Sequence, residues 1–149
     1  MNWIDQLPHR PPMRLLDEVV EITPGECAVG RRVTKPDDFY FQGHFPGDPV
    51  VPAVILVELV AQTGGLAVTR ASGLRVAALG PFRFPSAVRP GAMLEVRARV
   101  RGRFGGLYRI EGEVTADGCL AAAGSVTLST DRPSRAASPP PGGAVIEVT

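Results

Sequence analysis

The residues best suited to chemistry are His44 and Glu58, which lie fourteen positions apart. His44 is in a turn rich in glycine and proline, and Glu58 is the lone carboxylate of the apolar run that follows. A neutral imidazole can accept a proton near physiological pH, and a carboxyl group in an apolar site can donate one. The pair therefore predicts acid–base chemistry, with His44 as the base and Glu58 as the acid.

Each of these residues also has a structural explanation. A histidine in a glycine- and proline-rich loop is often a surface residue, and a glutamate in an apolar helix can belong to a buried polar network. Burying a carboxylate without partners costs several kcal/mol, so Glu58 must be paired, protonated or at the edge of a cavity. Gln62 lies one helical turn further on, on the same face, and is the expected partner of Glu58.

The apolar run over residues 53–72 predicts one long buried helix. It is apolar on nearly every face, which is typical of a helix surrounded by protein. Pro52 suits the first helical position, and Gly73 suits the end. Twenty residues would make a rod of about 30 Å. The first N–H groups of this helix, around Ala53, have no partner within it and could hold a developing oxyanion.

Aromatic residues beside His44 predict an apolar pocket. Such a pocket would suit a fatty or polyketide-like chain. The alternative is that these side chains only fill the core. The residues expected to line the pocket are Phe39, Phe41, Phe45 and Val54.

Strand patterns surround the helix in sequence. Residues 93–103 alternate almost strictly, with Glu95 and four arginines on one face and apolar residues on the other. Gly-Gly at 105–106 and Asp-Gly at 117–118 predict hairpin turns. The pattern predicts an α+β hot-dog fold, one long central helix wrapped by an antiparallel sheet of about six strands, and another α+β sandwich is the alternative. The remaining strands are expected over residues 13–23, 26–35, 74–84 (broken at Gly80-Pro81), 107–115 and 119–129.

Length and composition predict one domain over residues 1–130 and a tail rich in proline, serine and glycine over residues 131–149. Cys27 and Cys119 lie too far apart, without histidine neighbours, to indicate a disulfide framework or a zinc site. We expect both to be reduced, half-buried strand residues. No motif indicates a metal or another cofactor, so we expect none.

The apolar runs are too short for a membrane span, and the first residues lack the pattern of a signal peptide, so we expect a cytoplasmic protein. A net charge of +1 excludes a strongly basic nucleic-acid binder. Residues 74–109, however, contain eight arginines and one acidic residue. This segment would attract an acidic protein or a phosphate-bearing substrate.

The motif G-H-F-P-G-x-P-x-x-P over residues 43–52, followed by E-x-x-A-Q over residues 58–62, closely resembles that of the β-hydroxyacyl-acyl-carrier-protein dehydratases of the FabZ/FabA type. Leu-Pro-His-Arg at 7–10 and Arg-Phe at 83–84 also resemble segments of that family. The resemblance covers about residues 7–128.

The resemblance implies a dimer whose sheets join edge to edge, with His44 and Glu58 of different subunits in each active site. His44 would remove the C2 proton of a β-hydroxyacyl thioester and Glu58 would help the hydroxyl leave as water. The N–H of Ala53 would polarise the thioester carbonyl, and Gln62 would orient Glu58. The partner would be the acidic acyl carrier protein, docked on a basic rim at Arg83, Arg89, Arg97 and Arg99. The alternative for these arginines is the solvated face of a sheet.

The chain departs from the family pattern at a few positions. Ala53 replaces a glycine but keeps the N–H group, and Ala87 and Ala92 replace a proline and an aspartate. Glutamate at 58 is FabZ-like, whereas Asp48 is more FabA-like. A fatty-acid route and a polyketide or polyene route both remain open. The alternative functions are a hot-dog thioesterase and a carrier-binding subunit of a heterodimeric dehydratase.

Overall fold

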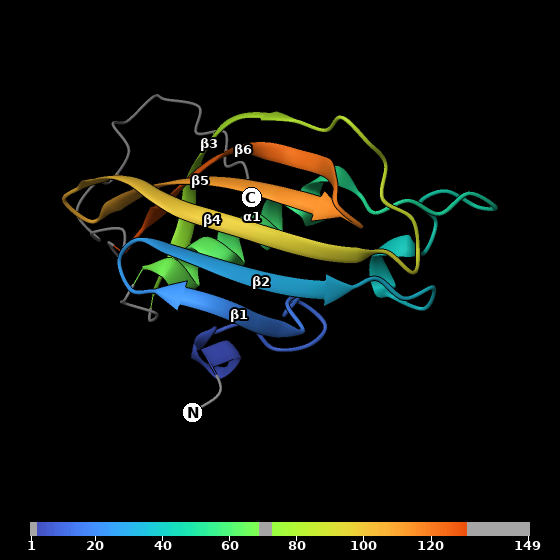
Figure 1. Ribbon diagram of the computed structural model, residues 1–149, viewed down its shortest axis with the longest axis horizontal. Coiled ribbons are helices and arrows are strands. Elements are labelled where there is room, and N and C mark those ends of the chain that lie inside the picture. The colour runs from blue at the N-terminus through green and yellow to red at the C-terminus, as the bar shows by residue number, and fades with distance from the viewer. Residues whose placement is uncertain (1–2, 69–72, 131–149) are drawn as a thin grey trace, which may run out of the picture.

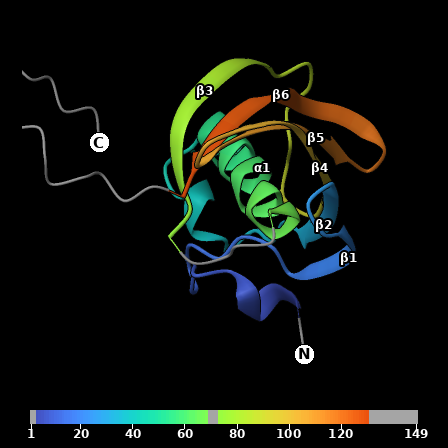
Figure 2. The ribbon, with the colours of Figure 1, turned by 90° about the vertical axis from the view of Figure 1, so that its left-hand side faces the viewer.

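The computed structural model describes residues 3–68 and 73–130. Six strands in the order β1-β2-β4-β5-β6-β3 form one antiparallel sheet that curves around helix α1 (Figures 1 and 2). This is the predicted α+β hot-dog fold. The elements in chain order are η1 (Trp3–Gln6), β1 (Glu18–Thr23), β2 (Cys27–Val33), η2 (Phe39–Phe41), α1 (Ala53–Ala67), β3 (Arg75–Arg83), β4 (Met93–Phe104), β5 (Leu107–Ala116) and β6 (Cys119–Ser129), where η marks a 3-10 helix.

Helix α1 is surrounded by protein along most of its length, as its apolar sequence predicts. It has 15 residues, however, and not the twenty expected, and Pro52 caps its start instead of opening its first turn. The chain leaves the helix at Val68, whose backbone is extended. The amide of Gly25 donates a hydrogen bond of 2.8 Å to the carbonyl of Ala67, so this carbonyl is satisfied without a further helical turn.

Gly73 therefore does not end the helix, contrary to the prediction. It has a φ of +85° and lies beyond residues 69–72, which are outside the described part of the chain. The predicted tail over residues 131–149 is also outside it. No described helix is long and apolar enough to cross a membrane.

The helix packs closely on the sheet at two glycines. A Cβ atom built on Gly112 of β5 would overlap the side chain of Val60 on α1. Conversely, a Cβ atom on Gly64 of α1 would lie 2.8 Å from Cγ2 of Ile110 on β5, closer than packed carbon atoms approach. The missing side chains on each element thus make room for branched side chains of the other.

The alternation predicted for β4 is confirmed. Leu94, Val96 and Ala98 are fully buried against the helix side of the sheet, whereas Arg97 and Arg99 on the opposite face are exposed. The hairpin turns are also where they were predicted. Asp117 and Gly118 both have positive φ, as a type I′ turn requires.

Strand β1 starts at Glu18, later than predicted, because the preceding backbone bonds to the helix. The side chain of Gln62 binds the carbonyl of Met13 at 2.7 Å and the amide of Leu15 at 3.0 Å. These backbone groups are therefore not available to the sheet. Cys27 is half-buried as expected, whereas Cys119 is exposed, and both are free thiols.

Strand β3 forms an edge of the sheet and is largely exposed on both faces. Its apolar residues include Leu79, which is 59% exposed, and Val76, which is 41% exposed. The predicted break at Gly80-Pro81 is wrong, since the strand continues through both with an irregular register against β6. An edge position tolerates Pro81, which has no N–H to donate.

Candidate active site

His44 is held in a tight turn between η2 and α1. Gly43 and Gly47 both have positive φ, which glycine adopts readily, and they reverse the chain on either side of the histidine. The amide of Val50 donates to the carbonyl of His44 at 2.9 Å, and the Nδ1 atom of His44 lies 3.2 Å from the carbonyl oxygen of Val50. A carbonyl oxygen can only accept, so Nδ1 carries the hydrogen and Nε2 keeps its lone pair. His44 is therefore set up to accept a proton at Nε2.

A second loop supports the turn of His44. The guanidinium of Arg89 forms an ion pair with Asp48, and the amide of Val51 donates to the carbonyl of Val88 at 2.8 Å. The ring of Phe45 stacks on His44, with 4.4 Å between the ring centroids. The second loop thus holds the turn, and Phe45 and the carbonyl of Val50 hold the imidazole.

Glu58 is half-buried on α1, and its hydrogen-bond partner on the helix is Gln62, as expected from the sequence. Nε2 of Gln62 donates to Oε1 of Glu58 at 3.0 Å. Gln62 is 1% exposed and also binds the backbone of Met13 and Leu15, which fixes the direction of its amide group. Because Gln62 donates, the Oε1 atom accepts, and the other carboxyl oxygen of Glu58 can carry a proton for transfer.

His9 also contacts Glu58, and sequence reasoning assigned it no role. Its Nε2 atom lies 3.3 Å from Oε1 of Glu58, and its Nδ1 atom is buried without a hydrogen-bond partner among the described residues. The segment is held by Arg10, which donates to the carbonyl groups of Leu7 and His9. One indication in the sequence that His9 could have a role is that the chain has only two histidines.

Glu58 lies at the edge of a largely apolar cavity of about 280 Å³. The cavity lies between the N-terminal segment, the second half of α1 and the start of β3. None of the four residues predicted to line a pocket is among its lining residues. Phe41 is instead in the core, and Phe39, Phe45 and Val54 are exposed to solvent. The apolar residues lining the cavity include Leu7, Ala61, Leu66, Leu74, Val76 and Leu128.

His44 and Glu58 of one chain do not meet in the described structure. His44 contacts Val50 and Phe45, whereas Glu58 contacts Gln62 and His9. Ala53 is exposed and is the first residue of α1, a position whose N–H has no partner within the helix. Within one chain, the candidate base His44 and the candidate acid Glu58 thus lie at two separate places.

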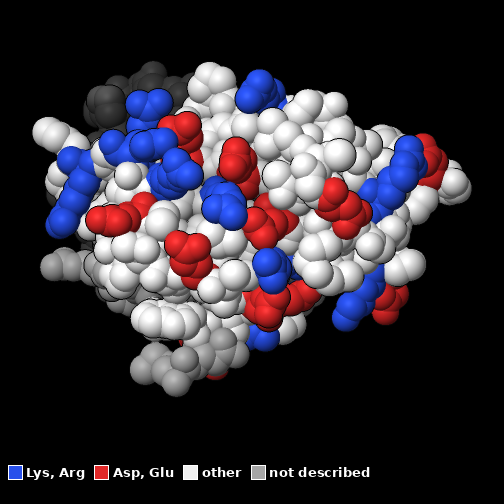
Figure 3. Space-filling model, in the orientation of Figure 1, with Lys and Arg blue, Asp and Glu red and all other residues white. Residues whose placement is uncertain are grey.

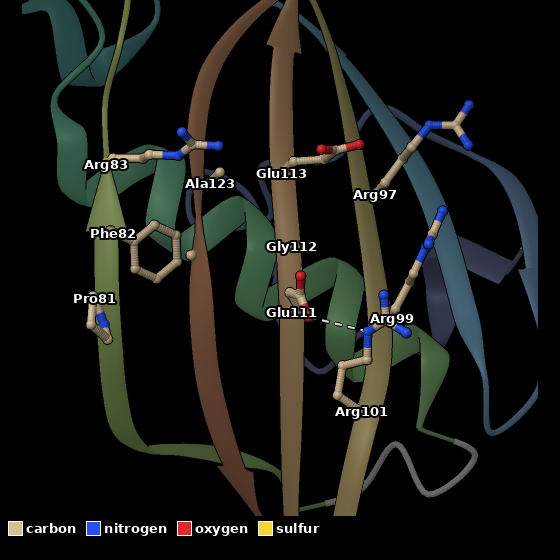
Figure 4. Close-up of a pocket in the computed structure, with 11 residues that line it drawn as sticks. Pro81, Phe82, Arg83, Arg97, Arg99, Arg101, Glu111, Gly112, Glu113 and Ala123 are labelled. Carbon is tan, nitrogen blue, oxygen red and sulfur yellow. Dashed lines mark hydrogen bonds and ion pairs between the residues drawn. The ribbon is translucent and has the colours of Figure 1, made fainter.

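The predicted docking arginines also separate into two places. Arg83, Arg97 and Arg99 line a groove of about 620 Å³ on the face of the sheet turned away from α1, as Figure 4 shows. Arg89 instead pairs with Asp48 beside the turn of His44. Acidic side chains lie among the arginines of the sheet face, and Figure 3 shows both signs of charge mixed there. This face is therefore not uniformly basic.

The curved sheet around one buried helix defines a hot-dog protein, with His44 in the turn before the helix and Glu58 on the helix as candidates for acid–base chemistry. The FabA-like domain family matches residues 7–125 of the chain. The chain therefore belongs to the FabA-like family.

Relatives of known name agree with this assignment. The 3-hydroxyacyl-acyl-carrier-protein dehydratase FabZ of Oleidesulfovibrio alaskensis is 37% identical over 130 residues, which cover 83% of this chain and 84% of that protein. FabZ of Chloroflexus aggregans is 34% identical over 134 residues, or 87% of this chain and 93% of that protein.

Solved structures share the fold at low sequence identity. A chain of the dehydratase heterocomplex ApeI:P from Xenorhabdus doucetiae has a TM-score of 0.75 at 16% identity, and the match covers 89% of this chain and 92% of that one. The E. coli PaaI protein from the phenylacetic acid degradation operon has a TM-score of 0.60 at 15% identity, covering 74% and 80%.

Proposed function

We propose that this protein dehydrates a β-hydroxyacyl thioester carried on acyl carrier protein to the trans-2-enoyl thioester. The observation that carries this proposal is the hydrogen bond from Nδ1 of His44 to the carbonyl of Val50, which leaves Nε2 free to act as a base. Glu58 supplies a carboxyl group beside an apolar cavity. The names of the FabZ relatives support the substrate class.

The reaction needs one base and one acid. Nε2 of His44 takes the proton from C2, and the electrons of that bond form the C2–C3 double bond. The C3–O bond breaks, and the hydroxyl leaves as water with the proton of Glu58. The N–H of Ala53, at the positive end of α1, holds the charge that develops on the thioester oxygen.

Two chains are needed to complete this site. Since His44 and Glu58 of one chain do not meet, each active site takes His44 from one subunit and Glu58 of the partner subunit. The exposed apolar edge of β3 supports a homodimer in which the two sheets join edge to edge. The alternative is a heterodimer with a related chain, since the structurally similar ApeI:P dehydratase is a heterocomplex.

The acyl carrier protein is acidic and would be attracted to basic side chains near the site. Among the four predicted docking residues, Arg89 lies beside the turn of His44, which supports its role. Arg83, Arg97 and Arg99 line the groove on the outer face, away from α1. We therefore expect Arg89 to contribute more to carrier binding than Arg97 or Arg99.

The test uses β-hydroxyacyl carrier-protein substrates with mass detection of the products. The wild-type protein should remove one water molecule from the acyl chain, and His44→Ala and Glu58→Gln should each abolish this loss while the dimer remains folded. Release of a free thiol without loss of water would instead identify a thioesterase. Turnover near that of the wild type in either variant would reject the proposal.

A further inference from the structure

Arg32 is a half-buried arginine near the end of β2 that the catalytic scheme does not use. Its side chain is 15% exposed. Its Nη2 atom lies 2.9 Å from Oδ1 of Asp38, and its Nη1 atom donates to the carbonyl of Leu15 at 3.1 Å. The guanidinium carbon lies 5.7 Å from the centre of the Tyr40 ring. The Nη1 atom of Arg32 also lies 3.5 Å from Oδ1 of Asp17. One cation therefore joins two segments, residues 15–17 and residues 38–40.

The first of these contacts leads to His44. Asp38 accepts hydrogen bonds from the hydroxyl of Tyr40 at 2.5 Å and from the amide of Lys35 at 2.9 Å. Its backbone carbonyl accepts from the amide of Phe41 at 3.1 Å, and the carbonyl of Phe41 accepts from the amide of His44 at 3.1 Å. Arg32 thus anchors the segment whose next turn presents the imidazole.

The second contact leads to Glu58. While the carbonyl of Leu15 accepts from Arg32, the amide of Leu15 donates to Oε1 of Gln62 at 3.0 Å. The other end of the Gln62 amide donates to Glu58. A continuous series of hydrogen bonds therefore runs from the guanidinium to the carboxyl group on the helix.

Electrostatics reinforce the cluster. Burial alone would raise the pKa of the Asp38 carboxyl, but hydrogen bonds from Tyr40, from the Lys35 amide and from Arg32, together with the charge of Arg32, outweigh it and hold this pKa below its ordinary value. Asp38 therefore remains a carboxylate that can bind the guanidinium. The planar fork of arginine can reach Asp38 and Leu15 together, which the single ammonium of lysine cannot do with the same geometry.

We propose that Arg32 is a positioning residue for both His44 and Glu58, acting on the turn through Asp38 and on the helix through Leu15 and Gln62. The role of Arg32 in turnover rests on the proposed function. Since His44 and Glu58 of one chain then belong to different active sites, the Arg32 of each chain acts on two sites of the dimer.

The first test compares Arg32→Met with Arg31→Met. Arg31 is the adjacent residue on β2 and forms exposed or half-buried ion pairs with Glu18 and Glu95, so it is a matched control. Misplacing both catalytic groups should lower kcat of Arg32→Met roughly 10- to 100-fold with little change in KM. Arg31→Met should retain the kcat of the wild type. A folded Arg32→Met dimer with unchanged kcat would overturn the proposal.

The second test does not depend on activity. The chain has two histidines, and each reports on one end of the series, because His44 lies in the turn and His9 contacts Glu58. The imidazole ¹H–¹⁵N signals are compared at one fixed pH and assigned with single histidine variants. Both should shift in Arg32→Met, and neither should shift in Arg31→Met. A response at only one imidazole would overturn the dual role.

Milder variants keep the proposal testable if Arg32→Met does not fold. Arg32→Lys keeps the charge and should recover part of kcat. Asp38→Asn interrupts only the branch that leads to the turn, so it should shift the signal of His44 and leave that of His9 unchanged. Equal shifts of both signals in Asp38→Asn would contradict two separate branches. If the wild-type protein fails to dehydrate any substrate, the proposed function fails while the imidazole signals still decide the positioning role.

Discussion

The Nε2 atom of His9 lies 3.3 Å from Oε1 of Glu58, the same oxygen that accepts a hydrogen bond from Gln62. Two side-chain nitrogen atoms therefore converge on one carboxyl oxygen of Glu58. Gln62 comes from the same helix, whereas His9 comes from the N-terminal segment, so the orientation of Glu58 depends on the packing of distant parts of the chain.

Replacing His9 should therefore slow the reaction more than it weakens substrate binding. We expect His9→Ala to lower kcat roughly tenfold, because Glu58 loses one of the two contacts that hold its Oε1 atom and thereby orient its other carboxyl oxygen. Steady-state kinetics would measure the effect. Asp5→Asn, at an exposed residue of the same segment, is the control and should behave as the wild type. An unchanged kcat in His9→Ala would show that Gln62 alone is sufficient.

Mixed dimers should reveal which chains share an active site. Chains carrying His44→Ala and chains carrying Glu58→Gln are each inactive as homodimers under the proposed function. After unfolding and refolding together in equal amounts, about half of the dimers would be mixed and would hold one intact site, so activity should return to about one quarter of the wild-type value. Absence of recovery, with mixed dimers demonstrated by mass, would mean that His44 and Glu58 act within one chain.

The edge of β3 should be the dimer interface. Leu79→Lys places a charge on its exposed apolar surface and should convert the dimer into an inactive monomer, as measured by light scattering together with turnover. Phe104→Lys is a matched control, because Phe104 is 85% exposed at the end of β4. A dimeric Leu79→Lys protein would exclude this edge as the interface.

The close contact between α1 and β5 should be sensitive to a single methyl group. Gly112→Ala should lower the free energy of unfolding by about 1–3 kcal/mol, because the new Cβ atom overlaps Val60. Gly102→Ala on β4 is the control, since its Cβ atom would lie 3.8 Å from the nearest atom outside its chain neighbours, Cβ of Arg109. Denaturant titration of both variants would measure the difference, and equal stabilities would show that the helix can shift to accept the methyl group.

Stability at acid pH should depend on Asp38. Its pKa is lower in the folded protein than in the unfolded chain, where the ordinary value is 3.8. The stabilising contribution is therefore complete above about pH 5 and is lost as pH falls through the folded-state pKa. The difference in free energy of unfolding between the wild type and Asp38→Asn should shrink as pH is lowered from about 5 to about 3. Asp37→Asn, at the exposed neighbour, is the control variant, and a constant difference for Asp38→Asn between these pH values would contradict the assignment.

Local patterns predicted the parts of the fold that local chemistry determines. Strand β4 alternates because one of its faces is buried, and the turn at 117–118 follows from residues that accept positive φ. The end of α1 was not predictable in this way. It depends on the amide of Gly25, which is remote in sequence and satisfies the carbonyl of Ala67.

The candidate site likewise has some residues that local patterns indicate and others that depend on residues remote in sequence. His44, Glu58 and Gln62 were recognisable from their spacing and from the apolar residues around them. The contacts of His9 and Arg32 were not, because each joins residues that are brought close only by folding. The four predicted pocket residues are neighbours of His44 in sequence and do not line the cavity beside Glu58 within one chain, so their role in a pocket stays a prediction.

The two glycines between α1 and β5 also limit how this protein can evolve. Val60 fits over Gly112 and Ile110 fits over Gly64, so a side chain added at either glycine would overlap its neighbour and push the helix away from the sheet. The depth of Glu58 in the molecule is therefore inherited with the fold. Under the proposed function, a change of acyl-chain preference would then require exchange of side chains that line the cavity, without a change in the position of Glu58.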